Sequence, residues 1–323
     1  MSLSDSTSPP DYSIGMDNVI PGTLIINRLP RPIVVTTRQL RRCEVKPNMH
    51  WTISAAAGAA LLNLVGANSA IAADRTAATD DSNHIALYYS DNSEPAYGIQ
   101  AVNKRLLDIG VRVSQVVIPG NAKPILKQSE HRALSQRESD ELIQYFHLGR
   151  RELLDEIREA GRKPEMHRGG YLQTSEPGVP PYPKVYDMKA LDRETTQFLQ
   201  RKFGRLHVNS SEAGVGIDEV MTIVSGGPYT WFFVFGGDVV GKLRFGEIHE
   251  NGKAWRISYP GLVPHGGYFD APHGLVVAYA HGPRHFVMRY ADTSVQGHRM
   301  LGDNPWIDYS SETPALLTRL DSH

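Results

Sequence analysis

Seven short segments rich in β-branched and aromatic residues divide the C-terminal half of this 323-residue chain, and Gly or Pro turns separate them. They are RLHVN (205–209), EVMTIVSG (219–226), YTWFFVF (229–235), DVVGKLRF (238–245), KAWRISYP (253–260), LVVAYAHG (275–282) and RHFVMRYA (284–291). Strands of this length and spacing are typical of an antiparallel sandwich or a small barrel. We therefore expect a β-rich catalytic domain over residues 184–312, with helices packed outside it.

The N-terminal half predicts an α/β region over residues 74–176. HIALYYS (84–90) and VRVSQVVIP (111–119) have strand composition, and the residues between them have helical spacing and end at Gly110. This is the pattern of a small β-α-β unit, which makes the whole chain α+β. Because no Gly-rich phosphate loop follows the first strand, no nucleotide cofactor is expected.

Further helices are predicted between the two regions. Ser135 and Glu138 form a capping-box pattern that opens a helix whose apolar stripe runs from Leu142 to Ile157 and ends at Gly161. Another helix is expected over 190–203. The Pro-rich stretch 176–184 before it predicts a stiff linker or rim loop and the internal boundary of the chain.

The N-terminal segment leaves the cellular location open. Residues 1–48 read as a leader or disordered segment, and residues 49–73 carry no charge from Trp51 to Ala73. The 49–73 stretch is a secretory signal with cleavage after Ala72, a twin-arginine leader or an Ala-rich buried helix. It is too polar for a stable membrane span. The protein is thus cytoplasmic or periplasmic/secreted. Residues 313–323 are expected to be a tail.

Composition excludes several classes of protein. The formal net charge is −1, and no run of Lys or Arg exceeds two residues, so no nucleic-acid partner is expected. Cys43 is the only cysteine, which excludes an intrachain disulfide and a Cys-built zinc site. Any metal must be held by His and carboxylate groups. A small-molecule substrate is expected, and a homo-oligomer is compatible with the sequence.

The stretch VPHGGYFDAPHG (263–274) contains Pro-His-Gly twice. Proline restricts the backbone before each histidine, and glycine lets the chain turn after it. His265 and His273 are therefore predicted to face one pocket, where neutral imidazoles suit acid–base catalysis with Glu219 as their partner.

His207, Glu219 and His265 also form a candidate metal site. The order of these residues loosely matches the two motifs of cupin barrels. His207 is followed by a loop and by Glu219 on a strand, and His265 comes later, after a Pro/Gly turn. Cupins usually have a second histidine two positions after the first, where this chain has Asn209. A His-Glu-His set would suit a divalent metal such as Fe or Mn.

FGRLHVNSSEAGVGIDEVMTIVSGGPYTWFFVF (203–235), VVGKLRF (239–245) and VPHGGYFDAPHG together resemble the 4-hydroxylaminobenzoate lyase family over roughly residues 185–292. The resemblance implies a lyase in aromatic compound degradation, which converts 4-hydroxylaminobenzoate into protocatechuate and ammonia. The residues themselves suggest Arg244 or Arg284 for the substrate carboxylate and Tyr229 or Trp231 for its ring.

Two other functions fit the sequence. One is a cupin-type metal-dependent oxygenase or isomerase that uses His207, Glu219 and His265. The other is a secreted binding protein without enzymatic activity, for which the signal-like segment would be the main support. Serine hydrolases, NTPases and zincins are disfavoured because their motifs are missing from the sequence.

Overall fold

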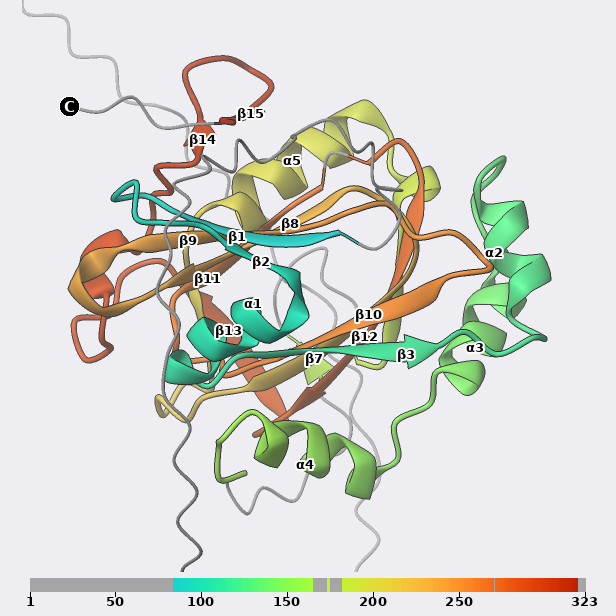
Figure 1. The fold of residues 1–323 in the computed structure, drawn as a ribbon, viewed down its shortest axis with the longest axis horizontal. Coiled ribbons are helices and arrows are strands. Elements are labelled where there is room, and N and C mark those ends of the chain that lie inside the picture. The colour runs from blue at the N-terminus through green and yellow to red at the C-terminus, as the bar shows by residue number, and fades with distance from the viewer. Residues whose placement is uncertain (1–83, 165–172, 175–181, 270, 319–323) are drawn as a thin grey trace, which may run out of the picture. The chain divides into compact units, whose positions relative to one another are not determined.

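Two five-stranded sheets pack face to face around one hydrophobic core (Figure 1). The computed structural model describes residues 84–164, 173–174, 182–269 and 271–318. The β8 sheet has the order β11 (His265–Tyr268), β8 (Tyr229–Val234), β9 (Val240–Phe245), β1 (Ile85–Tyr89), β2 (Ala96–Tyr97). The β7 sheet has the order β3 (Arg112–Val117), β10 (Lys253–Tyr259), β7 (Asp218–Gly226), β12 (Gly274–His281), β5 (Lys184–Asp187). All strand pairs within these two sheets are antiparallel.

Two smaller sheets complete the described strands. β6 (Val208–Ser210) and β4 (Gln173–Thr174) flank β13 (His285–Arg289), and β14 (Ile307–Asp308) pairs with β15 (Ala315–Leu316). The expected mixed architecture with antiparallel sheets is confirmed. Within the described ranges the two large sheets remain separate layers and do not close into a barrel.

The expected β-α-β unit is not formed. β1 pairs with β9 in one sheet, and β3 pairs with β10 in the other. Strands from both sides of the expected boundary at 176–184 thus share both sheets, and all described residues belong to one unit. The physical reason is that each N-terminal strand covers an otherwise open edge of a C-terminal one.

Alternation along the strands explains the core. Trp231 and Phe233 of β8 point into the sandwich, while Phe232 between them packs into a second cluster on the outer face. On β9, Leu243 and Phe245 are likewise buried in the main core. Burying each such side chain stabilises the fold by roughly 1.5–3 kcal/mol.

Five α-helices and four short 3-10 helices lie around the sheets in the described part of the chain. They are α1 (Gly98–Leu106), α2 (Lys123–Ser129), α3 (Gln136–Tyr145), α4 (Arg150–Glu159) and α5 (Arg193–Gly204), with 3-10 turns at 107–109, 188–190, 236–238 and 298–300. α4 covers the outer face of the β7 sheet, where Glu156 accepts hydrogen bonds from Arg112 and Arg256 (Figure 1). α5 lies beside β11.

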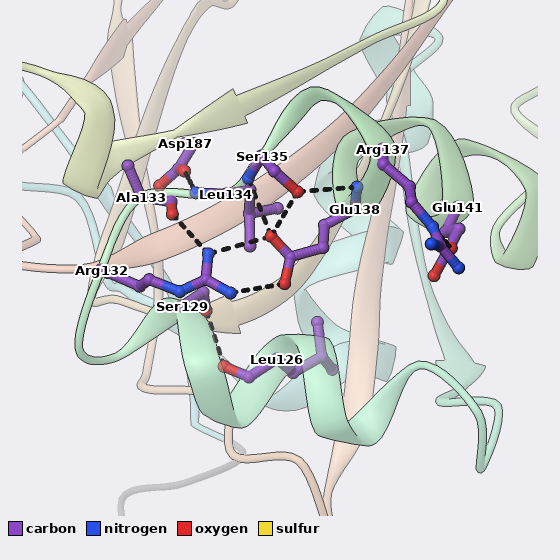
Figure 2. Close-up of polar contacts among 10 residues, drawn as sticks. All are labelled: Leu126, Ser129, Arg132, Ala133, Leu134, Ser135, Arg137, Glu138, Glu141 and Asp187. Atoms are coloured by element: carbon purple, nitrogen blue, oxygen red, sulfur yellow. Dashed lines mark hydrogen bonds and ion pairs between the residues drawn. The ribbon is translucent and has the colours of Figure 1, made fainter.

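The capping box at Ser135 is confirmed, since its side chain accepts from the Glu138 backbone and Glu138 accepts from the Ser135 N–H (Figure 2). The expected single helix up to Gly161 is two helices, because Gly149 has an extended conformation and begins α4 as its N-cap. Figure 2 also shows that Asp187 accepts a hydrogen bond from the Leu134 N–H, which attaches the α3 region to β5.

The C-terminal residues 313–318 are not a free tail. β15 pairs with β14, and the Lys242 Nζ donates to the carbonyl oxygens of Leu317 (2.8 Å) and Thr318 (3.0 Å). The same ammonium lies 4.1 Å from the centre of the Trp306 ring. This segment therefore covers the outer face of the β8 sheet.

The predictions for 1–48 and 49–73, including cleavage after Ala72, lie outside the described residues. None of the helices in the described ranges combines the length and the apolar composition that a membrane span requires.

Candidate active site

A small cavity lies between the two sheets, and the buried polar side chains of His207, Asn209, Glu219 and His265 line it. Its free space is about 50 Å³. Its walls are mainly aromatic, and its described lining residues are Tyr182, Tyr186, Phe203, His207, Asn209, Glu219, Met221, Trp231, Tyr259, His265, Gly266, Gly267, Phe269, Val276 and Met288. Glu219 is the only Asp, Glu, Lys or Arg among these lining residues.

Strand register places both histidines of the cavity side by side. His265 on β11 pairs with Phe233 of β8. Because the Phe233 side chain points into the sandwich, the His265 side chain points inward too. The backbones of His207 and His265 exchange two hydrogen bonds of 2.9 Å, and their ring centres are 4.7 Å apart. Although they are 58 positions apart in the sequence, the two imidazoles thus share one wall.

Both imidazoles are held in the same way. The Nδ1 of His207 lies 2.8 Å from the Arg205 carbonyl oxygen, and the Nδ1 of His265 lies 2.7 Å from that of Val263. Because a carbonyl oxygen only accepts, each Nδ1 carries the proton and donates it. The Nε2 of each ring is therefore the atom available to the cavity, the arrangement that usually orients metal-binding histidines.

Glu219 enters the cavity from the opposite sheet. It lies on β7 opposite Tyr259 of β10, and its exposed fraction is 4%. Its Oε1 accepts a hydrogen bond from the Tyr182 hydroxyl. Its Oε2 lies 3.5 Å from the Nε2 of His265.

Asn209 connects Glu219 with His265. Its Nδ2 donates to Glu219 Oε2 over 2.8 Å and lies 3.2 Å from His265 Nε2. Its Oδ1 is buried and has no hydrogen-bond partner among the described residues. The amide is therefore satisfied on one side only.

The protonation states follow from burial and these contacts. Burial raises the pKa of Glu219, but His265, Tyr182 and Lys184 together lower it by more, to about 2. Burial, followed by the neighbouring His265, lowers the pKa of His207 to about 3. At neutral pH the cavity thus holds an ionised carboxylate beside a neutral His207 imidazole.

Among the described residues, no three His, Cys, Asp or Glu side chains come together as a metal site. Of the predicted set His207, Glu219 and His265, the last two approach each other most closely, through Oε2 and Nε2. His207 lies against the His265 ring. The third polar group at the Glu219–His265 pair is the Asn209 amide.

Three residues of this site were not predicted from the sequence. The stretch around Tyr182 was expected to be a linker, but Tyr182 and Tyr186 line the cavity. The buried Lys184 between them places its ammonium 4.1 Å and 4.6 Å from the centres of those two rings. Burial lowers the pKa of Lys184 to about 7. The alternation Tyr-x-Lys-x-Tyr was the available signal for a strand facing the interior.

The structure separates the other predicted site residues from this cavity. His273 is not among its lining residues and lies 3.8 Å from Glu247 instead. Arg244 pairs with Thr230 on the outward-facing side of the β8 sheet, and Arg284 is exposed in the turn between β12 and β13. Trp231 does line the cavity, whereas Tyr229 is core and donates its hydroxyl to the Ser225 carbonyl.

An apolar groove of about 560 Å³ lies next to the cavity. It runs along β5 between the α3 region and α5, and it shares Tyr186 and Phe203 with the cavity wall. The rings of Tyr186, Phe203 and Phe269 form a cluster with centre distances of 6.0–6.5 Å. These rings therefore separate the cavity from the groove.

No known protein family and no curated protein sequence matches the chain. Among solved structures, it is similar to acireductone dioxygenase from Bacillus anthracis with a cadmium ion in its active centre. The match has 15% sequence identity and a TM-score of 0.44, and it covers 65% of this chain and 99% of that one. At this similarity the function has to be inferred from the residues of this chain.

Proposed function

We propose that the cavity is the active site of a small-molecule enzyme of the oxygenase or isomerase class, which uses a divalent metal held by His265 and Glu219. The observation that carries the proposal is the pair itself. A buried carboxylate and an imidazole, each fixed by a second hydrogen bond, lie 3.5 Å apart in a cavity whose described lining has no Lys or Arg. A divalent cation would neutralise this buried negative charge, which the nearby Lys184 offsets only in part.

The donor atoms fit such an ion. Ligands bonded to a divalent ion at about 2.0–2.2 Å lie roughly 2.8–3.6 Å apart for bond angles of 90–110°. The distance between Glu219 Oε2 and His265 Nε2 is within that range. One carboxylate and one imidazole are donors suited to Mn²⁺, Fe²⁺ or Zn²⁺.

When bound, the metal would polarise a substrate oxygen as a Lewis acid. The protein residues orient and shield the reacting groups. Tyr182 holds Glu219 Oε1, and the Oε2 atom, which accepts from Asn209 Nδ2, would bind the ion. His207, as a neutral imidazole, accepts a hydrogen bond from a substrate hydroxyl or amine through Nε2. The aromatic walls exclude water and so strengthen these electrostatic contacts.

The size of the cavity limits how the substrate enters. Free space of about 50 Å³ holds an ion and a few water-sized atoms. A ring-sized substrate needs Phe203 or Tyr186 to change rotamer, and the groove beyond them has ample volume. The proposal therefore includes entry from the groove side.

Metal binding by the purified full-length chain tests the proposal. After removal of metals by a chelator, titration calorimetry with Mn²⁺ or Zn²⁺ is expected to show one site. Glu219→Gln and His265→Ala are each expected to weaken it by about 100-fold or more, beyond the effect of losing an outer hydrogen-bond partner. His249→Ala, at an exposed turn, is the control and should bind as wild type does. Absence of binding by the folded wild type would refute the proposal.

A metal-free acid–base lyase is the second candidate. It is favoured by the continuous set of contacts from Tyr182 through Glu219 and Asn209 to His265, which needs no ion to satisfy Glu219. In this mechanism His265 Nε2 and Glu219 would transfer protons to the hydroxyl that leaves the hydroxylamino nitrogen as water, and from the water that adds to the ring before the nitrogen leaves as ammonia. The described cavity lining, however, offers no guanidinium for a benzoate carboxylate.

Ammonium release from 4-hydroxylaminobenzoate separates the two candidates. Release that continues in the presence of a strong chelator, and that His265→Ala abolishes, would favour the lyase. Release that stops on chelation and returns with added metal would favour the metal enzyme.

A further inference from the structure

We infer that the substrate of the proposed enzyme is an uncharged apolar compound with a hydroxyl group, which enters the cavity while the apolar body lies in the groove beside β5. This inference rests on the proposed function, because it takes the same cavity as the active site. The groove thus becomes a binding site for the body of the substrate as well as an entrance. The substrate class is a phenol or alcohol with an alkyl or aryl body and no acidic group.

The cavity presents hydrogen-bond acceptors to a ligand. The Nε2 of His207 carries a lone pair, since its Nδ1 holds the proton and donates to the Arg205 carbonyl. Glu219, whose pKa is about 2, is ionised and only accepts. The Asn209 amide already uses its Nδ2 to donate to that carboxylate. A ligand group suited to these atoms is therefore a donor, such as an O–H or N–H.

The charges around the cavity and the groove oppose an ionised ligand. Among the described lining residues of both, the only Asp, Glu, Lys or Arg residues are Glu219, Asp187 and Glu194, and all are acidic. They disfavour a carboxylate or phosphate on the ligand. A cationic head is opposed by Lys184, whose buried amine lies against two cavity rings and whose charge already acts on Glu219. An uncharged hydroxyl is thus the donor that suits the site.

The groove offers apolar surface to the body of such a compound. Its apolar and aromatic lining residues in the described part of the chain are Leu134, Val185, Tyr186, Ala190, Leu191, Phe198, Leu199 and Phe203. Phe198 of α5 is 51% exposed, so a large ring is left open to a ligand. The volume of about 560 Å³ lies within the roughly 300–1,000 Å³ that is typical of small-molecule sites lined by apolar side chains. The body therefore has both the room and the surface that it needs.

Two aromatic rings make the groove continuous with the polar atoms of the cavity. Tyr186 and Phe203 line both spaces, and both are only partly buried. The centre of the Phe203 ring lies 6.4 Å from that of the His207 ring. When the Phe203 ring turns aside, a body in the groove can take its place, and the hydroxyl then reaches His207.

The test uses the full-length chain freed of metals by a chelator, so that the ion does not enter the result. Titration calorimetry with 4-butylphenol is expected to show one site. 4-Butylbenzoate, which has the same body and an ionised head, should bind at least about 10-fold more weakly. Ala190→Trp, at an exposed position in the groove wall, should weaken the binding of 4-butylphenol by at least about 10-fold. Ala101→Trp, at an exposed position of α1 outside the groove lining, is the matched control and should bind as wild type does.

Nitrogen NMR of ¹⁵N-labelled histidine locates the hydroxyl. The Nε2 resonance of His207, assigned by its loss in His207→Gln, should move upfield when 4-butylphenol is added, because its lone pair accepts a hydrogen bond. Butylbenzene, which has the same body without the hydroxyl, should move it much less.

The outcomes separate this inference from the proposed function. Equal or tighter binding of 4-butylbenzoate would overturn the inference, and so would wild-type affinity for 4-butylphenol in Ala190→Trp or an unresponsive His207 resonance. Zn²⁺ binding by a chain that does not bind 4-butylphenol would also overturn it, although the metal site would stand. If 4-butylphenol binds as expected to a chain that binds no Zn²⁺, the ligand site stands and the metal proposal fails.

Discussion

Replacing Lys184 by methionine is expected to stabilise the protein at neutral pH. The Lys184 side chain is buried between two tyrosine rings, and burial lowers its pKa from 10.5 to about 7. In the unfolded chain the amine holds its proton up to about pH 10.5. Between pH 7 and 10.5 the unfolded state thus binds more protons, so the stability linked to this amine is complete above pH 10.5 and is lost as the pH falls towards 7.

The magnitude follows from the two pKa values. At 1.36 kcal/mol per pKa unit, this linkage costs the wild type about 4 kcal/mol at pH 7 and about 1 kcal/mol at pH 9.5. Methionine fills a similar volume and carries no proton. Lys184→Met should therefore exceed the wild type by about 4 kcal/mol in unfolding free energy at pH 7, and this advantage should shrink by nearly 3 kcal/mol at pH 9.5.

Urea denaturation of both proteins at the two pH values measures this difference directly. Lys253→Met, at an exposed position on β10, is the control and should show no pH-dependent advantage. An advantage of the same size at both pH values, or a less stable variant at pH 7, would refute the reasoning. Either result would mean that Glu219 and the tyrosine rings keep Lys184 protonated inside the fold.

Three further predictions concern other parts of the fold. His207, whose pKa burial lowers to about 3, should make the unfolding free energy fall between pH 6.5 and 3, by up to about 5 kcal/mol; His207→Gln should flatten this part of the pH profile of stability. Gly266→Ala should destabilise by about 1–3 kcal/mol, because a Cβ there would lie 2.9 Å from the Phe203 carbonyl oxygen, while Gly267→Ala, with no neighbour closer than 3.9 Å, should be tolerated in thermal unfolding. Lys242→Met should speed hydrogen exchange of residues 315–318, and unchanged exchange would show that β15 alone holds that segment.

Much of the fold could be predicted from local patterns. The seven C-terminal segments form strands, and the Ser135 capping box forms as expected. β11 was missed because Pro-His-Gly-Gly is typical of a turn. In the structure Gly266 is a strand residue whose missing side chain makes room for the carbonyl groups at the end of α5. That contact joins residues far apart in the sequence, so no local pattern reveals it.

The site could be predicted only in part, for a similar reason. The cupin-like pattern predicted that His207, Glu219 and His265 lie together, and all three line one cavity. The repeated Pro-His-Gly tripeptide also predicted a shared role for His265 and His273, which the structure places apart. His265 lies on β11 in the β8 sheet, whereas His273 directly precedes β12 in the β7 sheet. The contacts that separate them are tertiary. Tyr182 and Lys184 were missed because the prolines around them indicated a linker.

One consequence follows from the two-layer origin of the site. His207 and His265 belong to the β8 layer, and Glu219 belongs to the β7 layer, so the Oε2–Nε2 distance is set by how closely the layers approach. The distance between the two sheets is in turn fixed by the packing of remote core side chains such as Phe233 and Ile257. For the metal site proposed above, a methylene added or removed there would change the distance between the two donor atoms without any change to a ligand. Under that proposal, selection for metal preference would act on the hydrophobic core.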